Sequence, residues 1–345
     1  MTKLKVLVTG HTGFKGSWLS LWLSMNGHEL YGISLPPLKN GIYEQSNLDK
    51  IFSKSVIQDI SDFSKVKDFI NTVKPDLIYH LAAQPLVIDS YLNPVQTIQT
   101  NVIGSLNILE SVKNSTSVKK LLMVTTDKVY KNIGKVDGYS EEEMLGGEDP
   151  YSVSKSMTDL MIQSWSKSFK LPNLAIVRAG NVIGGGDRSP NRLIPDLVHA
   201  LNSKTPLTIR NPDSVRPWQH VLDCLNGYET AMAKLSNSNI EDNIWNFGPD
   251  DNQKMTVKEV CELALTSWPS SDSTEINYVS DNKSEYKESK MLTLNADKAH
   301  RELGWSNKLN NQAAIDYTME WEYKVSKGSD PFKITEEQIS NFLSI

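Results

Sequence analysis

The apolar residues in the first half of the chain form short runs, which longer segments with helical spacing separate. Short apolar runs are typical of buried strands, whereas apolar residues that recur every three or four positions indicate helices. The runs predict strands at Lys5–Thr9, Glu29–Ser34, Val56–Gln58, Leu77–Leu81, Leu121–Thr125 and Leu174–Arg178. Helices are predicted directly after the first strand and near Phe63–Val73, Pro94–Lys113 and Tyr151–Phe169. This alternation predicts an α/β fold with a Rossmann-type, doubly wound parallel sheet.

The pattern becomes less regular after Gly180. Gly184–Gly186 mark a loop, and prolines follow at short intervals as far as Pro217. The run Asn243–Phe247 predicts one late strand that could return to the sheet. We therefore expect a dinucleotide-binding domain made of residues 1–180 and about 219–248, and a smaller mixed C-terminal substrate domain made of about 181–218 and 249–345.

Composition and charge narrow the class of protein. The 345 residues carry a net charge of −5 without an evident basic stripe, so we expect no nucleic-acid partner. The first strand begins almost at Met1 and no apolar run reaches membrane-spanning length, so we expect no signal peptide, no membrane partner and a cytoplasmic location. Cys224 and Cys261 lack the spacing of metal ligands, which favours buried free thiols and no metal site.

A glycine-rich turn joins the first strand to the first helix. In the string Gly10-His-Thr-Gly13-Phe-Lys-Gly16 the glycines allow a tight turn and close backbone approach, so that amide groups and the helix dipole can hold a pyrophosphate. The spacing is one residue longer at its start than in the usual dinucleotide fingerprint. With the ends of the third and fourth strands, the turn predicts a cofactor site that comprises Gly10, Thr12, Gly13, Phe14, Gly16, Asp59, Ile60, Leu81, Ala82 and Ala83, together with Tyr151 and Lys155.

The residues alone leave the choice between NAD and NADP open. An acidic side chain at the end of the second strand would bind the ribose hydroxyls of NAD, but Ser34–Pro37 stands there instead. No arginine is present at this place either, although Lys15 and Lys39 could meet a 2′-phosphate.

Two acid–base pairs follow the later strands. Tyr151 and Lys155 lie four residues apart, so a helix places both on one face, where the ammonium can lower the pKa of the phenol. Asp127 and Lys128 form a second pair just after a strand, and Thr126 precedes them. One pair suffices for alcohol oxidation, so two pairs suggest a reaction with more proton transfers.

These features together resemble the extended short-chain dehydrogenase/reductase family. Within that family, longer strings are similar to those of the CDP-glucose 4,6-dehydratases, namely residues 10–22 (GHTGFKGSWLSLW), 126–130 (TDKVY), 146–155 (GGEDPYSVSK), 178–187 (RAGNVIGGGD), 192–196 (RLIPD) and 215–221 (VRPWQHV). The resemblance thins toward the C-terminus, where relatives tend to carry His-Glu-Ala near residues 287–289. It implies a tightly held NAD that is regenerated in each turnover.

The resemblance also implies roles for individual residues. Tyr151 would take the proton of the sugar 4-hydroxyl, Lys155 would lower the tyrosine pKa, and Thr126 would hydrogen-bond the reacting oxygen. Asp127 would be the acid for the departing 6-hydroxyl. Lys128 would be either the base at carbon 5 or an electrostatic stabiliser of the enolate. The diphosphate of the nucleotide sugar would meet Asn181, Arg192, Arg216 and Asn252.

Three functions remain open at this point. The first is a nucleotide-sugar 4,6-dehydratase that acts on CDP-glucose. The second is a nucleotide-sugar 4-epimerase, which shares the oxidation step but has no need of the acid Asp127. The third is a non-catalytic dinucleotide-binding regulator. From the family we expect a homodimer, or a higher homo-oligomer, formed through the helices Pro94–Lys113 and Tyr151–Phe169.

Overall fold

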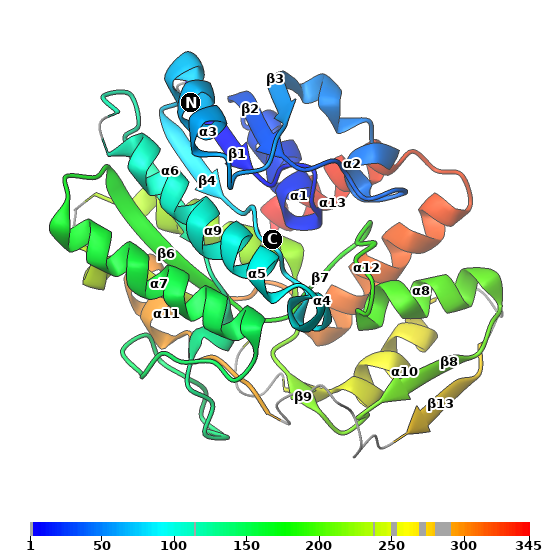
Figure 1. Cartoon of the computed structure of the whole chain (residues 1–345). Helices are drawn as coiled ribbons and strands as arrows, with labels where there is room; N and C mark the ends of the chain where they lie inside the picture. The colour runs from blue at the N-terminus through cyan, green and yellow to red at the C-terminus, as the bar shows by residue number, and fades with distance from the viewer. Residues whose placement is uncertain (1–2, 114, 237–238, 250–253, 269–273, 280–290) are drawn as a thin grey trace.

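A seven-stranded parallel sheet forms the centre of the molecule (Figure 1). The structure is a computed structural model that describes residues 3–113, 115–236, 239–249, 254–268, 274–279 and 291–345. The strand order β3-β2-β1-β4-β5-β6-β11 reverses direction between β1 and β4, as expected of a doubly wound sheet. The strands are β1 (Lys5–Thr9), β2 (Glu29–Ser34), β3 (Phe52–Ile57), β4 (Leu77–His80), β5 (Lys120–Val124), β6 (Asn173–Ala179) and β11 (Ile244–Phe247).

Helices cover both faces of this sheet. The side chains of Val6 and Val8 on β1 belong to one buried cluster and that of Leu7 to another, because successive residues of a strand point to opposite faces. The helices α3 (Phe63–Val73), α6 (Gly104–Val112) and α7 (Pro150–Ser168) cover one face, toward the viewer in Figure 1. The other face is covered by α1 (Phe14–Met25) and α9 (Val221–Lys234), with α11 (Asp297–Leu303) and α13 (Pro331–Ser344) packed against them.

The predicted strands are confirmed, including the late strand β11, which pairs with β6. The predicted helix at 94–113 is interrupted: α5 (Pro94–Ile98) is followed by a π-helical turn, η2 (Gln99–Ile103), before α6 begins. The side chain of Asn101 in this turn is buried and bonds the backbone of Gln84 and the hydroxyl of Ser154. A π-helical turn widens the helix locally, and here it directs an amide side chain toward the loop after β4.

A second group of elements lies beside the carboxyl ends of the strands. Its framework is the parallel pair β8 (Leu207–Arg210) and β13 (Ile276–Val279), with α8 (Leu193–Ser203), α10 (Val257–Ser267) and α12 (Asn311–Ser326). The remaining elements are short: α2 (Ile42–Gln45), η1 (Leu48–Ile51), α4 (Val87–Leu92), η3 (Asp127–Val129), β7 (Val182–Ile183), β9 (Val215–Arg216), β10 (Gln219–His220), η4 (Ile240–Asn243) and β12 (Met255–Thr256).

The C-terminal segment contacts both groups of elements. Helix α12 packs on α10, whereas α13 packs on α1, where the rings of Trp22 and Phe342 lie 5.8 Å apart. The segment that we expected in the substrate domain therefore also covers the dinucleotide-binding layer, and the division into two domains stays a prediction. Both cysteines are buried free thiols, as predicted. Among the described helices, none has the length and apolar character needed to cross a membrane.

Candidate active site

A cleft of about 400 Å³ opens at the carboxyl ends of the central strands. Doubly wound sheets bind their ligands at this edge, close to the point where the strand order reverses. The expected site residues that line the cleft are Phe14, Leu81, Ala83, Thr126, Asp127, Lys128, Tyr151, Lys155, Asn181, Arg192 and Arg216. Gly10, Thr12, Gly13, Gly16, Asp59, Ile60 and Ala82 lie outside its lining, and Asn252 lies outside the described residues.

The segment after β5 presents a buried carboxyl group to the cleft. Thr126 has an extended backbone and caps the short turn η3. Its hydroxyl donates a hydrogen bond to Oδ1 of Asp127 at 2.8 Å. The other oxygen, Oδ2, accepts no hydrogen bond from any described residue, and Asp127 is 3% exposed. Burial raises the pKa of this carboxyl, which Lys128, the Thr126 hydroxyl and Arg216 partly oppose. Asp127 is therefore easier to protonate than an ordinary aspartate, as an acid requires.

Helix α7 brings Tyr151 and Lys155 to the same cleft. The helix begins at Pro150, and the preceding Asp149 accepts a hydrogen bond from the Ser152 amide at 2.9 Å. One turn later, Nζ of Lys155 donates to the carbonyl oxygen of Val124 at 3.0 Å. Lys155 is thus tied to the last residue of β5, two residues before Thr126.

The pKa of the tyrosine differs from the expectation. Burial raises the pKa of Tyr151 to about 12, although the Thr126 hydroxyl opposes this shift. Burial also lowers the pKa of Lys155 to about 7, with a further contribution from Lys15. Burial thus raises the pKa of Tyr151 overall, and the lowering that we expected from Lys155 stays a prediction.

The shifted pKa of Lys155 predicts a pH-dependent stability. The pKa of Lys155 is about 7 in the folded protein against an ordinary value of 10.5, so the unfolded chain binds more protons between these limits. The free energy of unfolding should rise with pH across this window, by up to a few kcal/mol. We expect Lys155→Met to reduce this rise, measured by urea unfolding at several pH values. Parallel pH curves for the two proteins would contradict the predicted shift.

The glycine turn has the geometry of a dinucleotide cradle. Gly10 has φ 75°, and a Cβ atom there would lie 2.8 Å from the amide nitrogen of Ala82. A Cβ atom on Gly16 would lie 2.1 Å from the carbonyl oxygen of Gly10. No side chain caps the start of α1 at Gly13, so the first amide groups of the helix remain available to an anion. These residues fit a pyrophosphate group.

The neighbouring predicted residues have mainly structural partners. The Thr12 hydroxyl donates to the Leu35 carbonyl oxygen at 2.8 Å and so joins the glycine turn to the end of β2. Oδ1 of Asp59 accepts a hydrogen bond from the Ser61 amide at 2.8 Å, and Ile60 is buried. The adenine contact of Asp59 and Ile60 stays a prediction.

Lys15 does not lie where the binding of NADP would require it. Its Nζ donates to the Tyr228 hydroxyl at 3.2 Å, inside the cleft, and burial lowers its pKa. The ammonium is near enough to Lys155 and Asp127 to influence both electrostatically. The structure therefore places Lys15 in the cleft with the candidate catalytic groups and not at the end of β2, where a 2′-phosphate would be bound.

Two arginines line the same cleft as the candidate catalytic groups. Arg192 precedes α8, and its Nη1 donates to Oδ2 of Asp187 at 3.2 Å. Arg216 on β9 is 7% exposed and contributes to the electrostatics of Asp127. With Asn181 in the same lining, these cations provide the donors that a diphosphate needs.

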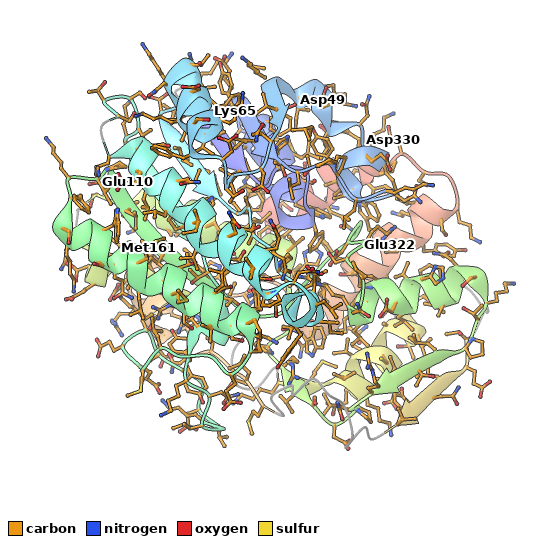
Figure 2. The ribbon with its side chains drawn as sticks, viewed as in Figure 1. Asp49, Lys65, Glu110, Met161, Glu322 and Asp330 are labelled. Carbon is orange, nitrogen blue, oxygen red and sulfur yellow. The ribbon has the colours of Figure 1, made fainter. Side chains whose placement is uncertain are left out.

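The residue that holds the loop with Arg192 was not predicted from the sequence. Glu322 on α12, labelled in Figure 2, accepts hydrogen bonds from the Gly186 amide at 2.8 Å and from both terminal nitrogens of Arg188 at 2.7 Å. Glu322 itself is 3% exposed. A buried carboxylate on a distant helix thus holds the loop that carries Asp187 and Arg192, and no local pattern could have predicted this contact.

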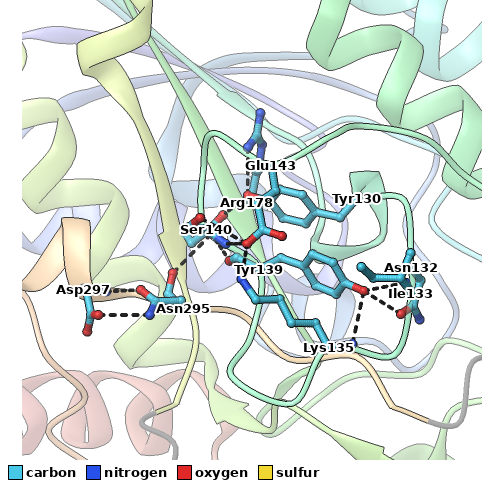
Figure 3. Close-up of polar contacts among 11 residues, drawn as sticks. Tyr130, Asn132, Ile133, Lys135, Tyr139, Ser140, Glu143, Arg178, Asn295 and Asp297 are labelled. Atoms are coloured by element: carbon cyan, nitrogen blue, oxygen red, sulfur yellow. Dashed lines mark hydrogen bonds and ion pairs between the residues drawn. The ribbon is translucent and has the colours of Figure 1, made fainter.

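The segment 125–130 is supported from behind by a buried ion pair of Arg178, the residue that Figure 3 shows beside Tyr130. Arg178 on β6 binds Asp159 on α7 through two hydrogen bonds of 2.8 and 2.7 Å, and neither side chain is exposed. A third nitrogen of Arg178 donates to the hydroxyl of Tyr130 at 2.8 Å. The same Asp159 accepts a hydrogen bond from Thr125 at 3.0 Å. Both ends of the segment 125–130 are therefore held against α7, which also carries Tyr151 and Lys155.

Comparisons with known proteins agree with this site. The family described as GDP-mannose 4,6 dehydratase matches residues 7–318. The chain is 38% identical to the CDP-glucose 4,6-dehydratase of Salmonella typhimurium, over 99% of this chain and 96% of that protein. A dTDP-glucose 4,6-dehydratase of Bacillus anthracis, solved in complex with NAD, is 25% identical with a TM-score of 0.78 and covers 96% of this chain and 99% of its own.

A second solved structure shows how widely this fold is used. The UDP-glucose 4-epimerase of Thermotoga maritima, solved with UDP-glucose, is 25% identical with a TM-score of 0.81 and covers 94% of this chain and 100% of its own. The fold is thus common to dehydratases and epimerases, whereas the family match and the full-length identity separate them. The chain belongs to the nucleotide-sugar 4,6-dehydratase family, within the extended short-chain dehydrogenases/reductases.

Proposed function

We propose that the protein is an NAD-dependent dehydratase that converts CDP-glucose to CDP-4-keto-6-deoxyglucose. The observation that carries this proposal is the buried carboxyl group of Asp127, which shares one cleft with Tyr151 and Lys155. An alcohol oxidation needs only the latter pair, whereas the loss of water also needs an acid. The choice of CDP-glucose is supported by the full-length similarity to the Salmonella enzyme.

The residues of the chain divide the proton transfers between them. Bound NAD supplies reversible hydride acceptance, and its positive charge favours the ionised form of Tyr151. Tyr151 takes the proton of the 4-hydroxyl, while Thr126 hydrogen-bonds the reacting oxygen. The resulting 4-ketone acidifies the hydrogen on carbon 5, and we assign Lys128, as the neutral amine, to take this proton. Asp127 protonates the departing 6-hydroxyl, which leaves as water. After hydride has returned to carbon 6, the amine of Lys128 gives the proton back to carbon 5.

Binding groups place the substrate for these steps. Arg192 and Arg216 neutralise the diphosphate, and Asn181 adds an amide donor. The amides of the glycine turn hold the cofactor pyrophosphate. Lys155 keeps its hydrogen bond to Val124 and therefore fixes the distance between α7 and the end of β5.

One assay separates the candidate functions. The protein is incubated with the glucose conjugates of CDP, dTDP and UDP, and the base-induced absorbance of a 4-keto product is recorded. We expect this absorbance with CDP-glucose. Formation of the galactose epimer without a keto product would indicate the 4-epimerase instead. Binding of NAD without any turnover of the three substrates would contradict the enzymatic assignment.

We further propose a cytoplasmic homodimer that is formed through α5, η2 and α7. Large apolar side chains are exposed on these helices: Val95 is 75%, Ile103 39%, Met157 42% and Leu160 54% exposed. Their burial against a second copy would remove this surface from water. We expect Val95→Glu with Leu160→Glu to shift the protein from dimer to monomer in sedimentation velocity. A wild-type protein that sediments as a monomer at micromolar concentration would contradict the proposal.

A further inference from the structure

The cleft continues beyond the two arginines to an end that has no role in the proton transfers. This end is built by α8 and β8, and its lining residues are Asp196, Leu207, Thr208, Ile209, Arg210 and Asn211. Under the proposed function the sugar lies at Tyr151 and the diphosphate lies between Arg192 and Arg216. The remaining part of the substrate, which is the nucleoside, must then occupy the α8–β8 end.

The strand β8 offers groups that suit a flat, polar ring. The Leu207 amide donates to the carbonyl oxygen of Glu275, which precedes β13, at 2.8 Å, and the Asn211 amide donates to that of Val279 on β13 at 3.1 Å. Because hydrogen-bonding groups alternate along a strand, the amide and carbonyl groups of Thr208 and Arg210 face away from β13. Ile209, which is 5% exposed, and Leu207 add apolar contacts. These features would hold any nucleobase and do not distinguish one base from another.

Asp196 is the group at this end that can distinguish bases. It stands in the first turn of α8 and lines the cleft, half-buried. Its carboxylate accepts no hydrogen bond and forms no ion pair among the described residues. Arg210 and His199 are near enough to lower the carboxyl pKa, but burial outweighs them and raises it. A partly desolvated acceptor without a partner gains most from a ligand that donates a hydrogen bond.

The pyrimidine bases differ at the position that such an acceptor could read. Cytosine carries an amino group on carbon 4, which donates, whereas uracil and thymine carry a carbonyl oxygen there, which accepts. An ionised carboxylate can only accept a hydrogen bond. It therefore attracts the cytosine amino group and repels the carbonyl oxygen of the other two bases.

We infer that Asp196 selects cytidine nucleotides by accepting a hydrogen bond from the exocyclic amino group of cytosine. This inference rests on the proposed function for the position of the nucleoside. It makes Asp196 a specificity residue that takes no part in the chemistry.

Calorimetric titration of the full chain with NAD bound tests this inference, with CDP and UDP as ligands. The wild type should bind CDP more tightly than UDP. Asp196→Asn keeps the side-chain shape but adds an amino group that can donate to uracil. We expect this variant to reduce the ratio of the two affinities by about 5- to 150-fold, the usual range for one base-reading contact.

Two control variants separate base reading from general effects. Arg216→Ala should weaken CDP and UDP about equally, because both carry the same diphosphate, and should leave their ratio unchanged. Asp213→Asn removes the same charge from an exposed residue outside the cleft lining, and should leave both affinities unchanged. An Asp196→Asn protein that keeps the wild-type ratio would overturn the inference, as would a wild type that binds both nucleotides equally.

The same titration stays informative if the proposed reaction is wrong. A protein that prefers CDP through Asp196 but does not dehydrate CDP-glucose would support base reading and contradict the dehydratase. A protein that dehydrates CDP-glucose, but whose Asp196→Asn variant keeps the wild-type ratio of CDP to UDP affinity, would support the dehydratase and contradict base reading. Retained UDP binding shows that the variant is folded.

Discussion

Tyr151→Phe is expected to lower the turnover of CDP-glucose by about two to four orders of magnitude, the usual effect of losing a general base. The phenyl ring keeps the packing of a side chain that is 7% exposed, so folding should be little affected. The loss is confined to the hydroxyl group that lies beside Thr126. Steady-state kinetics measures the fall, and calorimetry should show that CDP still binds.

Tyr323→Phe is the matched control for this variant. Tyr323 lies on α12 against Trp268 and is not part of the cleft lining. It loses the same hydroxyl group, and its turnover should remain at the wild-type level. Near-normal turnover of Tyr151→Phe itself would remove Tyr151 from the mechanism.

Asp127→Asn should separate the oxidation from the loss of water. The amide keeps the shape of the side chain and an oxygen for the hydrogen bond from Thr126, but it cannot supply a proton. Oxidation at carbon 4 should continue, while dehydration should slow by about two to four orders of magnitude. Reduced cofactor should then accumulate with CDP-glucose, visible as absorbance in the reduced nicotinamide band.

The two variants predict opposite cofactor states. Tyr151→Phe blocks the first step and should keep the cofactor oxidised, whereas Asp127→Asn should trap it reduced. If Asp127→Asn turns over at the wild-type rate without such a build-up, Asp127 is not the acid, and another group in the cleft must protonate the 6-hydroxyl.

Much of the framework follows from patterns that are local in the sequence. Apolar runs predicted the strands because burial on both faces demands uniformly apolar residues, and β2 extends over the predicted residues Glu29–Ser34. Tyr151 and Lys155 could be placed on one face of a helix because residues four apart lie about one helical turn from each other. The interruption of the helix at Gln99–Ile103 was missed, because a π-helical turn depends on the distant partners of Asn101.

The sequence by itself therefore determined the sheet, the glycine turn and the residue types available for proton transfer, since these depend on neighbouring positions. Only the tertiary structure decided their electrostatics. The pKa of Tyr151 rises and that of Lys155 falls because the fold buries both, and Lys15 reaches the cleft because α9 places Tyr228 beside it. The support of the Arg192 loop by Glu322 likewise joins residues far apart in the chain. Burial and long-range contact depend on packing, which a local pattern does not contain.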